Sequence, residues 1–118
     1  MSGSGDSSLQ FAKQLFYHRS ERIRIDIRLG FEGEKLKVEG YDIGETVREI
    51  WGDSDYEYFI TVAGEALEKL YRLSGIEVGR KQELIEHLAG SFSSNEAFSS
   101  FKEYLTANEI ECGVFTWA

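Results

Sequence analysis

The segment RIRIDIRL at residues 22–29 alternates strictly between charged and aliphatic side chains. An extended chain turns successive side chains to opposite sides, so this alternation predicts a β-strand with one buried face and one solvated face. The side chains expected on the buried face are Ile23, Ile25, Ile27 and Leu29. The protein must therefore contain a sheet with an apolar side, and that side requires a covering layer.

Three further segments have strand character. Gly30 and Gly33 follow the first strand, and KLKVEGY at residues 35–41 repeats its alternation, which predicts an antiparallel hairpin. A third strand is expected at residues 55–62, DYEYFITV, and a fourth within residues 110–117, IECGVFTW. In the third strand, the residues expected to point away from the core are Asp55, Glu57, Phe59 and Thr61. These segments should form one sheet.

Apolar residues recur at spacings of three and four in the other segments, which is the period of an amphipathic helix. Helices are expected at residues 8–18, 42–52, 63–74, 80–89 and 94–107. In the second of these, DIGETVREIWG, Asp42 is the predicted N-cap, Glu45 its capping-box partner and Gly52 the stop. The predicted order is α-β-β-α-β-α-α-α-β. The predicted fold class is α+β, a single layer of about four strands (a β-hairpin plus two further strands) covered by helices.

Size and composition indicate one domain. With 118 residues, the chain can bury a core without disulfides or metal ions. We expect a flexible, Gly/Ser-rich tail at residues 1–7 and a single α+β domain at residues 8–118. No apolar run approaches the roughly 20 residues that cross a bilayer. The single cysteine, Cys112, fits a reducing compartment, so we expect a cytoplasmic protein without a membrane segment.

The net charge is −8, from 21 acidic and 13 basic residues. Residues 22–39 contain five basic and four acidic residues, so the rest of the chain carries the negative excess. An acidic surface attracts cationic proteins and repels phosphate backbones. The charge therefore favours a basic protein partner and disfavours nucleic acid.

Acidic and aromatic residues are concentrated in GDSDYEYF, residues 52–59. One interpretation is structural, in that Asp55 and Glu57 balance basic residues on a neighbouring strand, namely Arg24, Arg28 or Lys37. A second is a patch that binds a basic partner, because aromatic residues rimmed by acids suit such an interface. The residues of this candidate partner-binding patch are Asp53, Asp55, Glu57 and Phe59.

A third interpretation is a metal-dependent enzyme that uses Asp42, Asp53, Asp55 and Glu57. A calcium loop of the EF-hand type does not fit, because its sixth and twelfth positions would be Tyr58 and Gly64. The sequence has no P-loop, no dinucleotide-binding glycine fingerprint and no H-E-x-x-H motif. We therefore assign no catalytic residue, no metal ligand and no cofactor.

The segment YDIGETVREIWGDSDYEYFITV, residues 41–62, resembles a set of small, uncharacterised bacterial proteins. These share a D-[IL]-G helix start followed by G-D-S-D-Y-E-Y. The resemblance implies that helix, turn and strand form one unit, and it transfers no catalytic residue. In size and acidity, the chain is also similar to bacterial immunity proteins, which neutralise toxin domains.

Together these observations predict a non-enzymatic cytoplasmic protein-binding domain whose acidic surface docks a basic partner. An immunity or inhibitor protein would fit this description. The alternatives are the metal-dependent enzyme that uses the Asp/Glu cluster and a homodimer of structural role, formed through the sheet.

Overall fold

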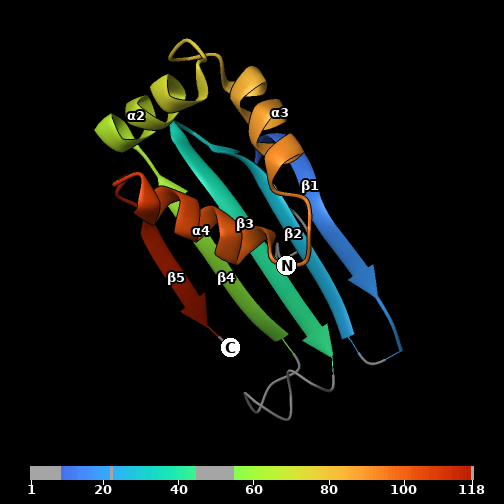
Figure 1. Cartoon of the computed structure of the whole chain (residues 1–118). Coiled ribbons are helices and arrows are strands. Elements are labelled where there is room, and N and C mark those ends of the chain that lie inside the picture. Colours follow the sequence, from blue (N-terminus) through green and yellow to red (C-terminus); the bar gives the residue numbers. More distant parts are fainter. Residues whose placement is uncertain (1–8, 22, 45–54, 118) are drawn as a thin grey trace.

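The computed structural model describes residues 9–21, 23–44 and 55–117 (Figure 1). In chain order, its elements are β1 (Gln10–Arg19), β2 (Ile23–Glu32), β3 (Lys35–Gly44), β4 (Asp55–Val62), α2 (Gly64–Ser74), α3 (Lys81–Ser91), α4 (Ala97–Ala107) and β5 (Gly113–Trp117). The expected tail at residues 1–7 lies outside the described residues.

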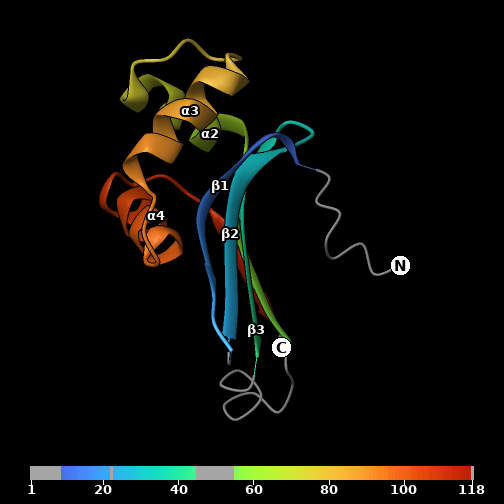
Figure 2. The same ribbon diagram turned by 90° about the vertical axis from the view of Figure 1, so that its right-hand side faces the viewer.

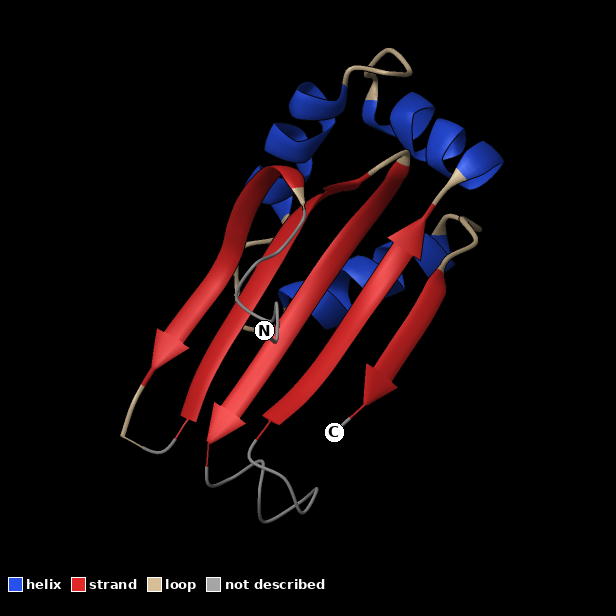
Figure 3. Cartoon of the chain, turned by 180° about the vertical axis from the view of Figure 1, so that it is seen from behind, coloured by secondary structure: helices blue, strands red, loops and turns tan. Residues whose placement is uncertain are grey.

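The strands form one five-stranded antiparallel sheet in the order β1-β2-β3-β4-β5. The first four described strands lie in the sheet in the order in which they occur in the chain, whereas β5 follows the described helices and pairs with β4. The three described helices all lie on one side of the sheet (Figure 2). On the other side, seen in Figure 3, no described helix covers the strands. The fold is a two-layer α+β arrangement.

The core lies between the sheet and the helices. Ile27, Val38 and Ile60 come from three neighbouring strands and are at most 1% exposed. The helices cover them with apolar side chains at helical spacing, including Leu67, Leu70, Leu84, Leu88, Phe101 and Leu105. Removal of this apolar surface from water is the main stabilising contribution to such a layer pair.

The helix predicted at residues 8–18 is wrong, because Gln10–Arg19 form strand β1. The pairing of β1 with β2 is irregular, with register shifts between Gln10 and Lys13 and between Gln14 and Phe16. A bulge adds a residue to one strand and interrupts the period of two. Leu15, which is buried, lies in the second irregularity. The apolar spacing of β1 consequently imitates that of a helix.

The predicted N-cap at Asp42 is also wrong. Strand β3 continues to Gly44, and Asp42 is paired with Ile25 of β2 and with Tyr56 of β4. Strand pairing on both sides outweighs the local capping pattern in this segment. The rest of the predicted helix, including Glu45 and Gly52, lies outside the described residues.

The predicted fold order is therefore wrong in two respects. Among the described residues, the first element is a strand rather than a helix, and the sheet has five strands rather than about four. The hairpin and the strand at residues 55–62 are present. So are three helices close to the expected ranges 63–74, 80–89 and 94–107.

Candidate functional site

We call the side of the sheet that faces away from the helices the open face. Strand β4 shows how its residues divide between the two sides. Ile60 is fully buried, and the ring of Tyr58 packs edge-on against Phe98 of α4 at a centroid distance of 4.6 Å. The intervening residues, Glu57 and Phe59, therefore point to the open face, as the alternation of the sequence predicts.

An aromatic pair lies at the centre of the β4 and β5 part of the open face. Phe59 and Phe115 are opposite each other in the register, and their rings stack with centroids 5.0 Å apart. Phe115 is 46% exposed. Glu57 is two residues before Phe59 on the same face. We call Glu57, Phe59 and Phe115 the acid-aromatic patch.

A lysine borders the acid-aromatic patch on the β3 side. The Lys37 ammonium lies 4.5 Å from the ring centroid of Phe59, a cation-π contact. The same ammonium is 3.4 Å from a carboxylate oxygen of Glu32 and 3.4 Å from one of Glu39. The positive charge of Lys37 is therefore already balanced by two carboxylates.

Glu57 has no ion pair among the described residues. The residues opposite Glu57 are Tyr41 on β3 and Trp117 on β5, neither of which is basic. The predicted pairing of Glu57 with Arg24, Arg28 or Lys37 is thus wrong. Its carboxylate is a negative charge beside partly exposed aromatic rings.

The other two acids of the predicted site are Asp53 and Asp55. Asp55 begins β4, where its backbone is opposite Ile43, but its side chain lies outside what the structure describes. Asp53 precedes the strand and falls in the undescribed range 45–54. Of the four predicted residues, the structure places Glu57 and Phe59 together.

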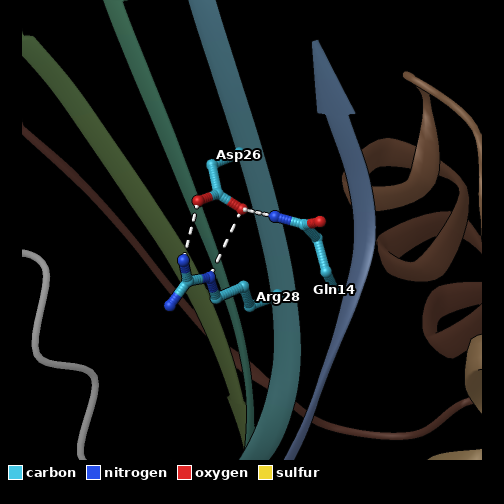
Figure 4. Close-up of polar contacts among 3 residues, drawn as sticks. All are labelled: Gln14, Asp26 and Arg28. Atoms are coloured by element: carbon cyan, nitrogen blue, oxygen red, sulfur yellow. Dashed lines mark hydrogen bonds and ion pairs between the residues drawn. The ribbon is translucent and has the colours of Figure 1, made fainter.

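The arginines of the hairpin have partners or neighbours of their own. A guanidinium nitrogen of Arg28 lies 3.0 Å from a carboxylate oxygen of Asp26, and the Gln14 side-chain amide donates a hydrogen bond of 3.0 Å to the other oxygen (Figure 4). Arg24 is opposite Arg19 of β1 in the register. Strand β3 therefore lies between these arginines, on β1 and β2, and the acid-aromatic patch on β4 and β5.

Asp42 lies on the opposite side of the sheet from Glu57. The Tyr58 hydroxyl donates a 2.7 Å hydrogen bond to the Asp42 carboxylate. Burial raises the pKa of the Asp42 carboxyl, and the hydrogen bond from Tyr58 opposes part of this rise. Burial and the bond to Asp42 also raise the pKa of Tyr58. The sheet therefore separates two acids that the metal-site interpretation requires to converge.

Within the described ranges, no three His, Cys, Asp or Glu residues are grouped so that they could hold a metal ion. In the same part of the chain, no helix has both the length and the apolar composition needed to cross a bilayer.

A shallow hollow of about 600 Å³ continues the open face beyond the acid-aromatic patch. It lies between the start of β5 and the start of α2, and its lining includes Glu65 and Glu111 together with Lys35. Thr61 and Gly113, which also line it, form the next pair on the same face as Phe59 and Phe115. The hollow therefore places two acidic residues and one basic residue next to the acid-aromatic patch.

Sequence reasoning missed three of these features: the stacking of Phe115 on Phe59, the position of Lys37 over that ring, and the two acids of the hollow. All depend on which strand lies beside β4, and the local pattern does not encode that choice. No protein-family model, curated protein or solved structure matches the chain. Its function is therefore inferred from its own residues.

Proposed function

We propose that the chain is a non-enzymatic, cytoplasmic protein-binding domain that docks a basic protein on its acid-aromatic patch. An immunity or inhibitor protein would act in this way. The observation that carries the proposal is the carboxylate of Glu57, which has no ion pair in the described part of the chain and lies next to a stacked aromatic pair.

The chemistry of this patch supports binding of a cation. Phe115 offers an apolar surface that is 46% exposed, and aromatic side chains contribute strongly to protein interfaces. A lysine or arginine from a partner would gain both the charge of Glu57 and the ring face of Phe115. The contact between Lys37 and Phe59 is an example of this packing within the protein itself. The net charge of −8 would steer a cationic partner toward the molecule.

The arrangement favours binding over metal-dependent catalysis. The enzyme interpretation needs Asp42 and Glu57 in one site, but they lie on opposite sides of the sheet. A carboxylate on each side of a β-sheet cannot share a metal ion whose ligands lie about 2 to 2.6 Å from it.

A labelled peptide tests the proposal. The probe is an eight-residue peptide of alternating lysine and valine, and its binding is measured by fluorescence anisotropy at increasing salt concentration. We expect Glu57→Lys to weaken binding about fivefold at low salt, with the difference shrinking as salt rises. A peptide of alternating glutamate and valine should bind more weakly than the lysine peptide.

The matched control is Glu103→Lys. Glu103 is an exposed acid on α4, on the helix side of the molecule, and its replacement makes the same change in net charge. If both variants lose affinity equally, the peptide responds to overall charge and the acid-aromatic patch is not the docking site.

A further inference from the structure

The two edges of the sheet differ in how well they are protected from pairing with another strand. Native proteins block exposed edges with charges, bulges, proline or a covering element. Edge strand β1 has two irregularities in its register, and Phe11 has a positive φ of 57°. It also carries the exposed residues Lys13 and Arg19, and it packs against α3. The β1 edge is therefore well protected.

Edge strand β5 has none of these protections in its described residues. Its sequence, GVFTW, contains no charge and no proline. Its pairing with β4 runs without a register shift from Gly113 to Trp117. Val114 and Phe115 point to opposite sides of the sheet and are 40% and 46% exposed. In the order of the described strands, β5 is the last, so its outer backbone groups face away from the sheet.

We propose that the β5 edge binds an extended, cationic segment of the partner protein as a sixth strand. The backbone of that segment would pair with β5, and its alternate side chains would lie on the two sides of the sheet. This inference rests on the proposed function, because it specifies how the basic partner binds.

The charges around β5 favour a cationic occupant. Glu57 is opposite Trp117 near one end of the strand, and Glu111 lies two residues before its other end. Glu111 and Glu65 also line the hollow next to Gly113. Long basic side chains of an added strand could cross the exposed ring of Phe115 and reach these acids.

A second copy of the chain fits the β5 edge less well. It would bring the same acidic residues to the interface between the two copies, and each chain carries a net charge of −8. Like charges at an interface oppose association. A partner strand that alternates basic residues on the open face with β-branched residues beside Val114 avoids this repulsion.

Backbone methylation of the lysine-valine peptide tests strand addition directly. In an added strand, only alternate N–H groups point toward β5. One peptide carries N-methyl groups on its lysines and another carries them on its valines. We expect methylation of one set to weaken binding to the full chain at least about tenfold, and methylation of the other set to change it less than about twofold. The amides of β5 that point away from β4 should also become protected from hydrogen exchange when the unmethylated peptide binds.

Two substitutions with equal exposure provide a matched comparison. Phe115 on β5 and Tyr17 on β1 are both 46% exposed. Phe115→Ala should weaken binding of the lysine-valine peptide about fivefold, whereas Tyr17→Ala should change it less than about twofold. Neither residue belongs to the buried core, so both variants should fold.

The contrary results separate this inference from the proposed function. If Glu57→Lys weakens binding but neither methylated peptide differs from the parent and the β5 amides stay unprotected, strand addition is refuted and the acid-aromatic patch remains the docking site. If the chain sediments as a dimer without peptide and its β5 amides are already protected, a second copy occupies the edge instead. If the lysine-valine peptide binds no better than the glutamate-valine peptide, both proposals fail.

Discussion

The two sides of the sheet are formed by the same strands but are stabilised by different interactions. On the helix-covered side, Ile27, Val38 and Ile60 are almost completely buried. On the open face, the side chains form ion pairs, a cation-π contact and a stacked aromatic pair, and Tyr17 and Phe115 remain 46% exposed. Burial of aliphatic groups contributes several times more stability than exposed ion pairs do. The covered side therefore determines the fold, and the open face can serve binding.

Neighbouring residues of β4 provide the sharpest test of this difference. Ile60→Ala should lower the free energy of unfolding by about 2–5 kcal/mol, because it leaves a cavity in the core. Phe59→Ala, one residue earlier and on the open face, should lower it by about 1–2 kcal/mol through lost stacking and cation-π contacts. Urea unfolding of the two variants measures both values. Equal losses would show that the two sides contribute alike.

Gly40 tests how tightly the covered side is packed around Tyr58. A Cβ atom at Gly40 would overlap a ring carbon of Tyr58, whose hydroxyl bonds to Asp42 and whose ring packs on Phe98. Gly40→Ala should therefore lower the free energy of unfolding by about 1–3 kcal/mol, because the ring must move.

The matched control for Gly40→Ala is Gly90→Ala in α3. Nothing lies within 4 Å of a Cβ added at Gly90. Because alanine is the better helix former, this variant should be more stable by about 0.5–1 kcal/mol. Thermal unfolding of both variants measures the contrast. If Gly40→Ala is as stable as the unsubstituted chain, space for a methyl group remains beside Tyr58.

The half-buried Asp42 predicts a pH dependence that belongs to the covered side. Its folded-state pKa lies above the ordinary value of 3.8, so the folded state holds the proton more tightly than the unfolded state does. The resulting stabilisation is complete below that value and is lost as pH rises through the folded-state pKa. Asp42→Asn removes this dependence but keeps an oxygen that can accept the hydrogen bond from Tyr58.

Relative to the unsubstituted chain, Asp42→Asn should therefore become more stable as pH rises from about 3 to about 7. The other carboxyl groups are common to both proteins, so their contributions cancel in the difference. Urea unfolding at several pH values measures it. A difference that stays constant with pH would mean that burial does not change the titration of Asp42.

The ion pair of Asp26 should give the smallest effect. The side chains of Arg28 and Asp26 are 40% and 17% exposed, and the pair lies on the open face. Asp26→Asn should lower the free energy of unfolding by less than about 1 kcal/mol, and added salt should reduce the difference. A larger, salt-insensitive loss in urea unfolding would show that the open face also determines the fold.

Part of this architecture can be predicted from the sequence because it depends on near neighbours in the chain. The β2–β3 hairpin follows from a strict alternation, and the structure buries Ile27 and Leu29 as expected. The same rule places Glu57 and Phe59 on one side of β4. In these segments, the local period and the tertiary environment agree.

The remaining features depend on pairing between distant segments. The sequence of strand β1 predicts a helix because its bulges interrupt the alternation. Asp42 is predicted as a helix cap because a local sequence pattern contains no information about the two strands that pair with it. The candidate site has the same origin. Phe115 meets Phe59 across three intervening helices, and the register puts Tyr41, not an arginine, opposite Glu57.

The late position of the helices has a consequence for synthesis of the chain. The first four described strands are complete at Val62, but the buried residues of the described helices lie between Leu67 and Leu105. Because synthesis proceeds at about 5–20 residues per second, the aliphatic side of the nascent sheet stays exposed to water for several seconds. An apolar surface exposed in this way is prone to aggregation until the helices are complete.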